Sequence, residues 1–220
     1  MIINLNKPIG WTSFDVCKKV KSITKEKKVG HGGTLDPFAS GVLVVGTGKD
    51  TKKLKDVSDE KKTYDATLLL GKTTDTLDLE GKVIKRKKVP ILSEKTIKDA
   101  LILFLGDYCQ TPPMYSAKKV AGRKLYEYAR KNIKVKREPV MLKIFSISLN
   151  NFDEKIISFS VECSKGTYVR VLAKDIAERL GTIGYLISLT RTKVGNYTLI
   201  KSQSIESFES TWKSFTQKKN

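Results

Sequence analysis

Residues 29–41 read VGHGGTLDPFASG, a glycine-rich loop that carries the only histidine of the chain, His31. Four glycines in thirteen residues permit backbone conformations that a Cβ would forbid, and they allow a ligand to approach the main chain closely. Asp36 precedes Pro37, which disfavours helix at Asp36 and removes the next backbone donor. The apolar run at residues 41–45 predicts a buried strand. A carboxylate on a loop that is braced by a strand is well placed for chemistry.

Asp36 also has an ordinary structural interpretation. An aspartate in a glycine-rich loop commonly forms an Asx turn, in which its side chain bonds to the backbone two residues on. The loop taken alone favours this interpretation, so evidence for a catalytic role of Asp36 has to come from other motifs.

The composition indicates a folded, strongly basic protein. The chain has 220 residues, of which 40% are hydrophobic, a size that suits one large domain or two small ones. Its 42 Lys and Arg outnumber 23 Asp and Glu and give a net charge of +19. A field of this sign attracts polyanions, nucleic acid above all, although a basic drift in composition without a binding site is the alternative.

Other features limit the compartment and the cofactors. Three separated cysteines, Cys17, Cys109 and Cys163, do not suggest a disulfide framework and favour a reducing cytoplasm. No apolar run approaches the roughly 20 residues of a membrane-spanning helix, and residues 1–6 read as a strand rather than a signal peptide. With one histidine and no C-x-x-C pair, we expect no protein-bound metal.

Two Gly-Lys pairs tempt a phosphate-loop interpretation, but neither completes the pattern. Ala66 stands where the glycine before Gly71-Lys72 would be needed, and Asp50 stands where Ser or Thr must follow Gly48-Lys49. We therefore exclude an NTPase.

Hydrophobic periodicity predicts helices and strands without strict alternation, which indicates an α+β fold. Thr12 and Asp15 resemble a capping box. Ser93 is expected to cap a helix that ends at Gly106; its apolar stripe comprises Ile97, Ala100, Leu101, Phe104 and Leu105. Residues 51–62 suggest a short helix plus loop. Residues 157–163 alternate as a strand, and a terminal helix near residues 205–215 precedes a trailing end at 218–220.

Two further segments suggest ligand contacts. Arg170 lies off the apolar stripe of the helix predicted at 169–180, so it is free to point at a ligand. Residues 115–137 interleave nine Lys and Arg with Tyr115, Tyr126 and Tyr128, a pattern suited to a surface that follows an RNA backbone and stacks on bases. A merely solvated helix face explains this second pattern equally well.

Taken together, motifs spread over roughly residues 3–200 resemble the tRNA pseudouridine-55 synthases of the bacterial TruB type. Any one match could be accidental, but all of them occur in order. They are residues 6–13 (NKPIGWTS), 30–43 (GHGGTLDPFASGVL), 62–64, 74–76 and 78–81, 111–118 with 126–130, and 164–170 with 189–191.

The resemblance implies that Asp36 is the catalytic carboxylate, acting as a nucleophile at C1′ or as a base toward C2′. It implies that Arg170 pairs with Asp36 and orients it. Tyr64 would stack on the flipped uracil, near its C5 proton. The sequence does not choose between the two routes.

The resemblance also implies a set of RNA contacts. Tyr168 would hold the other side of the pocket, Leu189 would pack against the base, and His31 would occupy the space that the flipped nucleotide leaves. The alternative for His31 is a structural histidine whose hydrogen bonds are made within the protein. The alternative for Tyr64 and Tyr168 is an aromatic side chain that packs into the core from a strand face. The remaining residues expected to bind substrate are Lys7, Gly32, Gly33, Thr34, Tyr115 and Lys118.

The implied fold is an α+β, pseudouridine-synthase-like, mixed and largely antiparallel sheet flanked by helices. We expect a catalytic domain at residues 1–200 with an RNA-gripping thumb insertion at about 110–140. Residues 201–220 would form a short C-terminal helical tail in place of a full PUA domain, and the high positive charge would compensate for its loss. We expect a cytoplasmic monomer that needs no cofactor, metal, membrane or obligate protein partner, and whose partner is the T stem-loop of tRNA.

Functions of other classes compete with this prediction. One is a tRNA-folding helper whose catalysis is dispensable, and another is a basic nucleic-acid-binding module without enzymatic activity. A phosphate-transferring enzyme is the weakest candidate, because no phosphate cradle is present.

Overall fold

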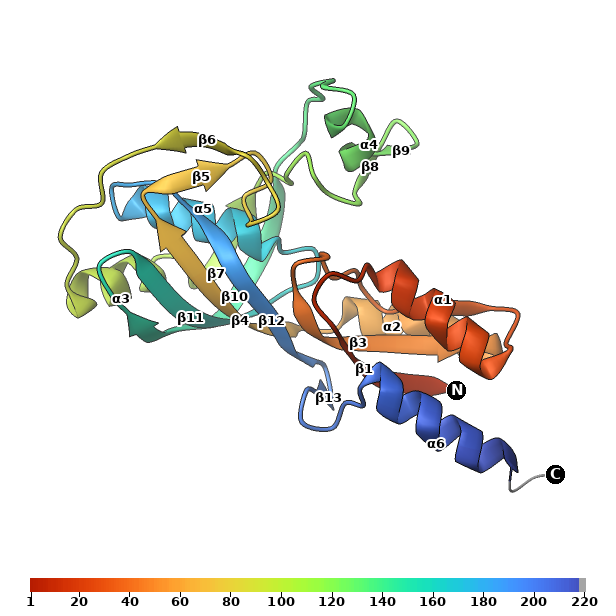
Figure 1. The fold of residues 1–220 in the computed structure, drawn as a ribbon. Helices are drawn as coiled ribbons and strands as arrows, with labels where there is room; N and C mark the ends of the chain where they lie inside the picture. The colour runs from red at the N-terminus through yellow and green to blue at the C-terminus, as the bar shows by residue number, and fades with distance from the viewer. Residues whose placement is uncertain (218–220) are drawn as a thin grey trace. The chain divides into compact units, whose positions relative to one another are not determined.

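The computed structural model describes residues 1–217 and divides the chain into two compact units (Figure 1). The first unit contains residues 1–64 and the C-terminal segment from Leu189, and the second contains residues 65–188. Strands β4 (Lys62–Leu70) and β12 (Gly184–Val194) each run from one unit into the other. The predicted trailing end, Lys218 to Asn220, lies outside the described residues.

In the first unit, residues 1–64 alternate strands with short helices. Its elements before β4 are β1 (Ile2–Lys7), α1 (Ser13–Thr24), β2 (Val29–His31), β3 (Ser40–Thr47), a 3₁₀ helix η1 (Gly48–Lys53) and α2 (Leu54–Asp59). The C-terminal segment adds the end of β12, then β13 (Tyr197–Thr198) and α6 (Ile205–Gln217). The strands predicted at the N-terminus and at residues 41–45 are confirmed.

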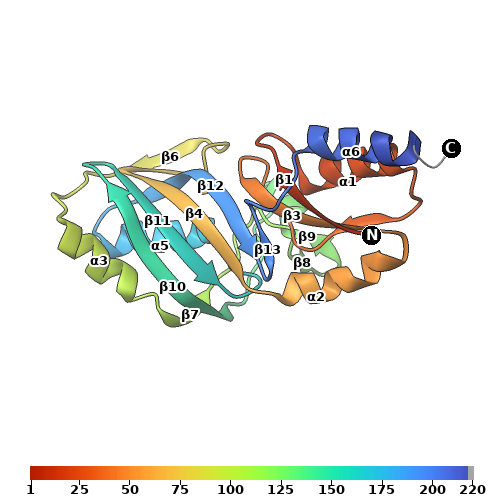
Figure 2. The ribbon, with the colours of Figure 1, turned by 90° about the horizontal axis from the view of Figure 1, so that it is seen from below.

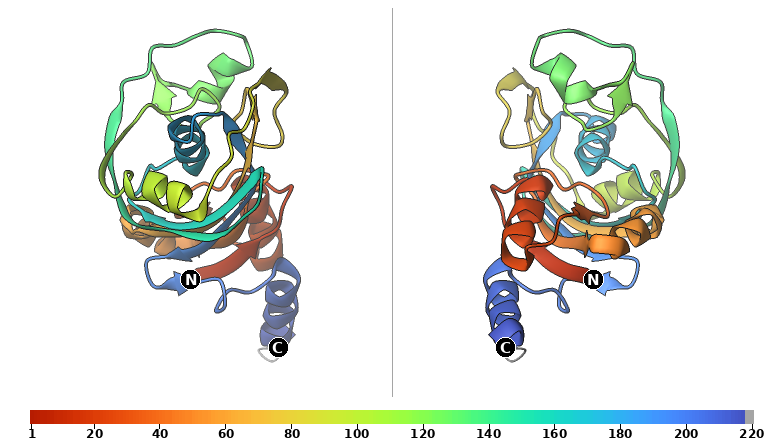
Figure 3. Two further views of the ribbon diagram at one scale, coloured as in Figure 1. Left: turned by 90° about the vertical axis from the view of Figure 1, so that its left-hand side faces the viewer. Right: turned by 90° about the vertical axis from the view of Figure 1, so that its right-hand side faces the viewer.

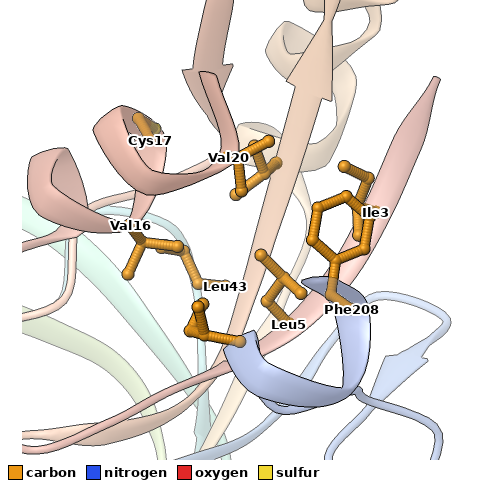
Figure 4. Packing of buried hydrophobic residues seen from close by; sticks show 9 residues of the cluster. Ile3, Leu5, Val16, Cys17, Val20, Leu43 and Phe208 are labelled. Atoms are coloured by element: carbon orange, nitrogen blue, oxygen red, sulfur yellow. The ribbon is translucent and has the colours of Figure 1, made fainter. Parts of the chain in front are cut away.

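One core of this unit is formed by α1 and α6 against β1 and β3. The buried side chains that meet there are Ile3, Leu5, Val16, Cys17, Val20, Leu43, Val45, Ile205 and Phe208, most of which Figure 4 shows pointing toward one another. Figure 2 shows α1 and α6 side by side, and Lys19 of α1 pairs with Glu209 of α6 at 2.6 Å.

The capping box predicted at the start of α1 is confirmed. The Thr12 hydroxyl oxygen accepts a hydrogen bond from the Asp15 backbone N–H at 3.1 Å, and the Asp15 carboxylate accepts one from the Thr12 N–H at 3.0 Å. This reciprocal pair satisfies donors that the first turn of a helix otherwise leaves open.

The second unit is built on long antiparallel strands. Its elements between β4 and β12 are β5 (Lys72–Thr74), β6 (Val83–Arg86), α3 (Glu94–Ile102), β7 (Gly106–Gln110), β8 (Lys119–Val120), β9 (Arg123–Lys124), α4 (Leu125–Ala129), β10 (Val140–Phe152), β11 (Ile156–Cys163) and α5 (Val169–Arg179). Helices α3 and α5 lie on the same side of β10 and β11 (Figure 3). The alternation predicted for residues 157–163 is confirmed, because Ile157, Phe159, Val161 and Cys163 are all buried.

The described residues form one sheet of nine strands and two small hairpins. The strand order of the sheet is β1-β3-β12-β4-β11-β10-β7, with β2 on β3 and β13 on β12. The pair between β12 and β3 is parallel, whereas β1 with β3, β10 with β11 and β10 with β7 are antiparallel. The predicted α+β class with a mixed, largely antiparallel sheet is therefore confirmed.

The structure corrects the end of one predicted helix. Helix α3 stops at Ile102 rather than at Gly106, and Leu105, expected in its buried stripe, is 43% exposed. Tight turns end the helix, because the N–H groups of Phe104 and Leu105 bond back only three residues, to Leu101 and Ile102. The boundary predicted at residue 200 between a catalytic domain and a tail stays a prediction.

Candidate active site

The loop that carries Asp36 connects β2 to β3 in the first unit. Strand β2 pairs with β3 so that Gly30 faces Gly46, and the N–H of Gly32 donates to the Val44 carbonyl at 2.8 Å. The Asp36 carbonyl accepts from the Ala39 N–H at 3.1 Å, which closes a turn. Asp36 is half-buried. The carboxylate is thus carried by a short segment with a strand at each end.

The guanidinium of Arg191 holds this loop from β12. Its Nε donates to the Val42 carbonyl at 2.8 Å, and its two terminal nitrogens donate to the Thr34 and Gly33 carbonyls at 3.2 and 3.1 Å. Arg191 is only 1% exposed. A buried guanidinium offers several donors in a fixed plane, so one side chain immobilises both the start and the end of the loop.

Two residues near the N-terminus complete this support. Lys7 is fully buried, and its Nζ donates to the carbonyls of Pro8, Trp11 and Pro37 at 2.8, 2.6 and 3.3 Å. The hydroxyl of Ser13 bonds to the backbone of Leu35, accepting from its N–H at 2.9 Å and donating to its carbonyl at 3.2 Å. Lys7, predicted to bind substrate, is therefore placed as a support of the loop.

His31 lies at the start of the same loop and is half-buried. Burial, and secondly the positive charge of Arg191, lower the pKa of its imidazole below the ordinary 6.5, while the backbone of Gly33 acts in the opposite direction. Among the described residues its buried Nδ1 has no hydrogen-bond partner. His31 therefore keeps one buried ring nitrogen that no group of the described residues satisfies.

Tyr64 and Leu189 are the other predicted residues of the first unit. Tyr64 is 8% exposed on β4 and Leu189 is 5% exposed on β12, the strand next to β4 in the sheet. The hydroxyl of Thr192 on β12 donates to the Thr63 carbonyl at 3.3 Å. Because Thr190 pairs with Ser40 at the start of β3, the first unit brings the Asp36 loop, Leu189 and Tyr64 onto three neighbouring strands.

Arg170 is the central cation among the predicted residues of the second unit. It is 3% exposed and forms a salt bridge with the equally buried Asp78, at 3.2 Å between Nη1 and Oδ2. It also donates to the carbonyls of Thr76 and Tyr115 at 2.7 and 2.9 Å. The prediction that Arg170 is free to point at a ligand is thus corrected. Its guanidinium already ties the Thr76–Asp78 turn to the segment that carries Tyr115.

Tyr168 immediately precedes α5 and is held through its backbone by Gln110. The Gln110 side-chain amide accepts from the Tyr168 N–H at 2.8 Å and donates to the Tyr168 carbonyl at 3.1 Å. It also donates to the Tyr108 hydroxyl at 3.2 Å, and that hydroxyl donates to Asp175 at 2.5 Å. Burial, and secondly the bond to Asp175, raise the pKa of Tyr108 far above its ordinary value. Tyr108 therefore serves as a neutral donor.

Tyr115 and Lys118 lie in the segment between β7 and β10, where a thumb is predicted. Both are half-buried, and the Lys118 carbonyl accepts from the Leu125 N–H at 2.9 Å. Lys124 and Arg130 lie over the ring of Tyr126, at 5.4 and 5.3 Å from its centroid. Some of the predicted interleaving of cations and aromatics is thus used within the segment itself as cation–π contacts.

Sequence reasoning missed three residues that organise these sites. Arg191 and Asp78 lie inside matched motifs, but a motif does not say which backbone groups a side chain holds, so the sequence gives neither residue a role. Gln110 has no sequence signal beyond its place before Thr111-Pro112. The four predicted residues Arg170, Tyr168, Tyr115 and Lys118 belong to the second unit, and the others belong to the first.

Two features are absent from the part of the chain that the structure describes. Residues 1–217 contain no group of three or more His, Cys, Asp or Glu placed to hold a metal ion. None of the helices in this range combines the length and the apolar character needed to cross a lipid bilayer.

Comparisons with known proteins agree with the motifs. Residues 21–169 match the family model described as "TruB family pseudouridylate synthase (N terminal domain)". A tRNA pseudouridine synthase B from Clostridium acetobutylicum is 50% identical over 196 residues, covering 89% of this chain and 68% of the relative. That of Clostridium kluyveri is 46% identical, covering 95% of this chain and 72% of the relative.

Among solved structures, a Cbf5–Nop10–Gar1 complex matches with a TM-score of 0.79 and 26% identity. The match covers all of this chain and 56% of that chain. An archaeal box H/ACA sRNP Nop10–Cbf5 complex has a TM-score of 0.73 at 23% identity, which indicates a common fold. This chain thus spans a little over half the length of these structural relatives.

Proposed function

Because the chain belongs to the TruB family of pseudouridylate synthases, we propose that it converts uridine 55 in the T loop of tRNA to pseudouridine, with Asp36 as the catalytic carboxylate. The observation that carries the proposal is the 50% identity to a tRNA pseudouridine synthase B over 89% of the chain. The support given to the Asp36 loop by Arg191, Lys7 and Ser13 is what a catalytic group on a loop requires.

The reaction rearranges bonds without a redox or energy source. The C1′–N1 bond of uridine breaks, the uracil turns, and a C1′–C5 bond forms. The proton on C5 is lost, and N1 takes up a proton, so the product is an isomer of the substrate. Asp36 acts either as a nucleophile at C1′ or as a base toward C2′, and both routes need a carboxylate held still against the ribose.

We propose distinct roles for the other residues of the first unit. A base in a tRNA loop has to leave its stack before the enzyme can reach it, at a cost of a few kcal/mol. Tyr64 would stack on the flipped uracil and Leu189 would pack against it. His31, half-buried at the start of the Asp36 loop, would contact the RNA where the base has left.

Residues of the second unit would act on the base and the RNA. Tyr168 would form one side of the uracil pocket. The hydrogen bonds between its backbone and Gln110 fix Tyr168 at the N-terminus of α5. Tyr115, Lys118 and the basic segment at 110–140 would grip the T stem-loop. The pairing of Arg170 with Asp36 that the resemblance implies stays a prediction. We also propose a cytoplasmic monomer. The three cysteines are far apart in the sequence, a pattern that suits a reducing compartment.

Release of tritium from C5 tests the proposal, because the C5 proton leaves only if the new carbon–carbon bond forms. We expect the wild-type protein to release one equivalent from tRNA labelled with [5-³H]uridine, and none when residue 55 is cytidine. We expect the variant Asp36→Asn to release none while still shifting tRNA on a native gel. The exposed Asp107 provides a matched control, and Asp107→Asn should behave as wild type.

Two results would contradict the proposal. Tritium release by Asp36→Asn at the wild-type rate would refute the proposal that the Asp36 carboxylate is catalytic. Absence of release by the wild-type protein, with tRNA binding intact, would instead favour the folding-helper or RNA-binding alternatives.

A further inference from the structure

The β5–β6 hairpin and the segment after it carry a basic surface that the proposed active site does not use. We propose that this surface binds the sugar–phosphate backbone of tRNA beyond the target loop, an inference that rests on the proposed tRNA substrate. We call it the hairpin track, and it consists of the side chains of Lys72, Lys82, Lys85, Arg86, Lys87 and Lys88, together with Lys155 from the turn between β10 and β11.

The cations of the hairpin track are exposed and unpaired. All four residues of β6 are exposed, and of the seven cations only Lys72 is half-buried. None of the seven forms an ion pair with any of residues 1–217. Surface lysines elsewhere in this unit do form such pairs, for example Lys95 with Asp99 and Lys98 with Glu94, each at 2.6 Å. Clustered like charges without counter-charges repel one another, and a polyanion relieves that repulsion.

The backbone beneath the track is fixed at both ends. At one end the Lys82 N–H donates to the Asp75 carboxylate at 2.8 Å. At the other end the Lys87 N–H donates to the Gly71 carbonyl at 3.0 Å, and the Thr182 hydroxyl donates to the Lys88 carbonyl at 2.9 Å. The cations are thus presented from a defined surface rather than from a loose loop.

These anchors also give the track a direction. Asp75 precedes the turn of Thr76 and Asp78 that holds Arg170 near the start of α5, whereas Thr182 follows the end of α5. Figure 1 shows β5 and β6 running beside α5. With a rise of roughly 3.3 Å per residue, residues 82–88 span about 20 Å. The track therefore leads away from Arg170. The sugar–phosphate backbone of a tRNA whose T loop is bound near Arg170 would continue in this direction.

A groove of about 940 Å³ lies at the far end of the track. Its apolar lining includes Leu69, Val89, Ile91 and Phe152, and its cations are Lys72, Lys87, Lys88 and Lys155. Asp153 and Glu154 also line it, but the Asp153 carboxylate already accepts the N–H groups of Lys155 and Ile156, each at 2.8 Å. An apolar lining beside cations suits a nucleotide, whose base is apolar on its face and whose phosphate is anionic.

The salt dependence of tRNA binding tests this surface. The test variant is Lys85→Gln/Arg86→Gln/Lys87→Gln/Lys88→Gln. The control removes the same charge from exposed lysines of the first unit, as Lys52→Gln/Lys55→Gln/Lys193→Gln/Lys201→Gln. Dissociation constants for full-length tRNA are measured from 50 to 400 mM KCl with each set of changes in an Asp36→Asn background, so that no turnover occurs.

We expect the slope of log K against log salt to become shallower by about 0.7–0.9 for each phosphate that the protein no longer neutralises. If two to four of the removed cations contact phosphates, the slope of the test variant changes by about 1.4–3.6. The control should change the slope by less than about 0.5. With active protein at saturating tRNA, the hairpin variant should release tritium at the wild-type rate.

Each opposing result has a definite meaning. Equal slopes of log K against log salt for the test and control variants would overturn the hairpin track as an RNA contact. The track would then be assigned to an acidic protein partner instead. Equal losses of affinity for tRNA and for a DNA duplex of similar length would overturn the assignment to tRNA. Because binding and tritium release are measured separately, failure of the proposed catalysis would be distinguishable from failure of the track.

Discussion

The replacement Arg191→Met tests whether the Asp36 loop depends on the buried guanidinium. Methionine fills a similar volume but removes the donors to the carbonyls of Gly33, Thr34 and Val42. Hydrogen bonds made by a charged group contribute roughly 1.5–3 kcal/mol each, but removing a buried charge also relieves its desolvation cost. We therefore expect a net loss of about 2–4 kcal/mol in the free energy of unfolding.

For a chain of this length, each kcal/mol lowers Tm by roughly 2–4 °C, so Arg191→Met should melt about 4–16 °C below wild type. At 20 °C, where the variant is still folded, tritium release should fall at least about tenfold, because the loop no longer holds Asp36 in one geometry. Circular dichroism gives Tm, and single-turnover tritium release gives the rate.

Two further variants make this prediction specific. Arg179→Met removes an exposed arginine and should leave both Tm and rate close to wild type. Arg191→Lys keeps the charge but not the planar array of donors, and should lie between wild type and Arg191→Met. Wild-type melting and wild-type turnover by Arg191→Met would refute the view that the guanidinium holds the loop.

Three other predictions follow from individual contacts. Gly41→Ala should yield little folded protein, because a Cβ there would overlap the backbone of Arg191 and Gly41 has φ +108°; a soluble variant that melts like wild type would contradict this. Gln110→Met should lower the free energy of unfolding by about 2–4 kcal/mol, by leaving the Tyr168 N–H and carbonyl without their amide partner, and urea titration measures the loss. The pKa of His31 is lower in the folded state than in the unfolded chain, so the unfolded chain takes up a proton first as the pH falls. The contribution of neutral His31 to the free energy of unfolding is therefore complete above pH 6.5 and is lost as the pH falls through the lowered pKa. Wild type should therefore lose more stability than His31→Gln between pH 7 and pH 5, and equal losses in thermal melts would contradict the assignment.

Most of the fold could be predicted from patterns that repeat along the chain. The alternation at residues 157–163 and the Thr12–Asp15 capping box depend on neighbours in sequence, so the sequence contains the whole signal. The end of α3 could not be predicted in this way. Apolar residues continue to Leu105, but the chain turns at Leu103 and leaves some of them exposed.

The motifs predict a set of site residues, which stays a prediction, but they do not predict the contacts that these residues make. Motifs located Asp36, Tyr64 and Arg170, but Arg170 proved to be buried against Asp78, a partner 92 positions earlier in the chain. Lys7 was expected to touch substrate, yet its Nζ bonds to three carbonyls of its own unit. The sequence of a motif is the same whether its lysine or arginine binds a phosphate or a backbone carbonyl, and only the folded structure distinguishes the two.

This distinction bears on how the loop achieves rigidity. A glycine-rich loop gains freedom of backbone conformation at the cost of entropy when it is fixed, so something else has to hold it. Here three side chains bond to the main chain of residues 33–42, so the loop is held through its backbone. Lys7 and Ser13 come from near the N-terminus and Arg191 from β12. Substitutions at these supports should lower the rate of the chemical step more than tRNA affinity. Changes to the hairpin track should do the reverse, so the two kinds of variant separate positioning from binding.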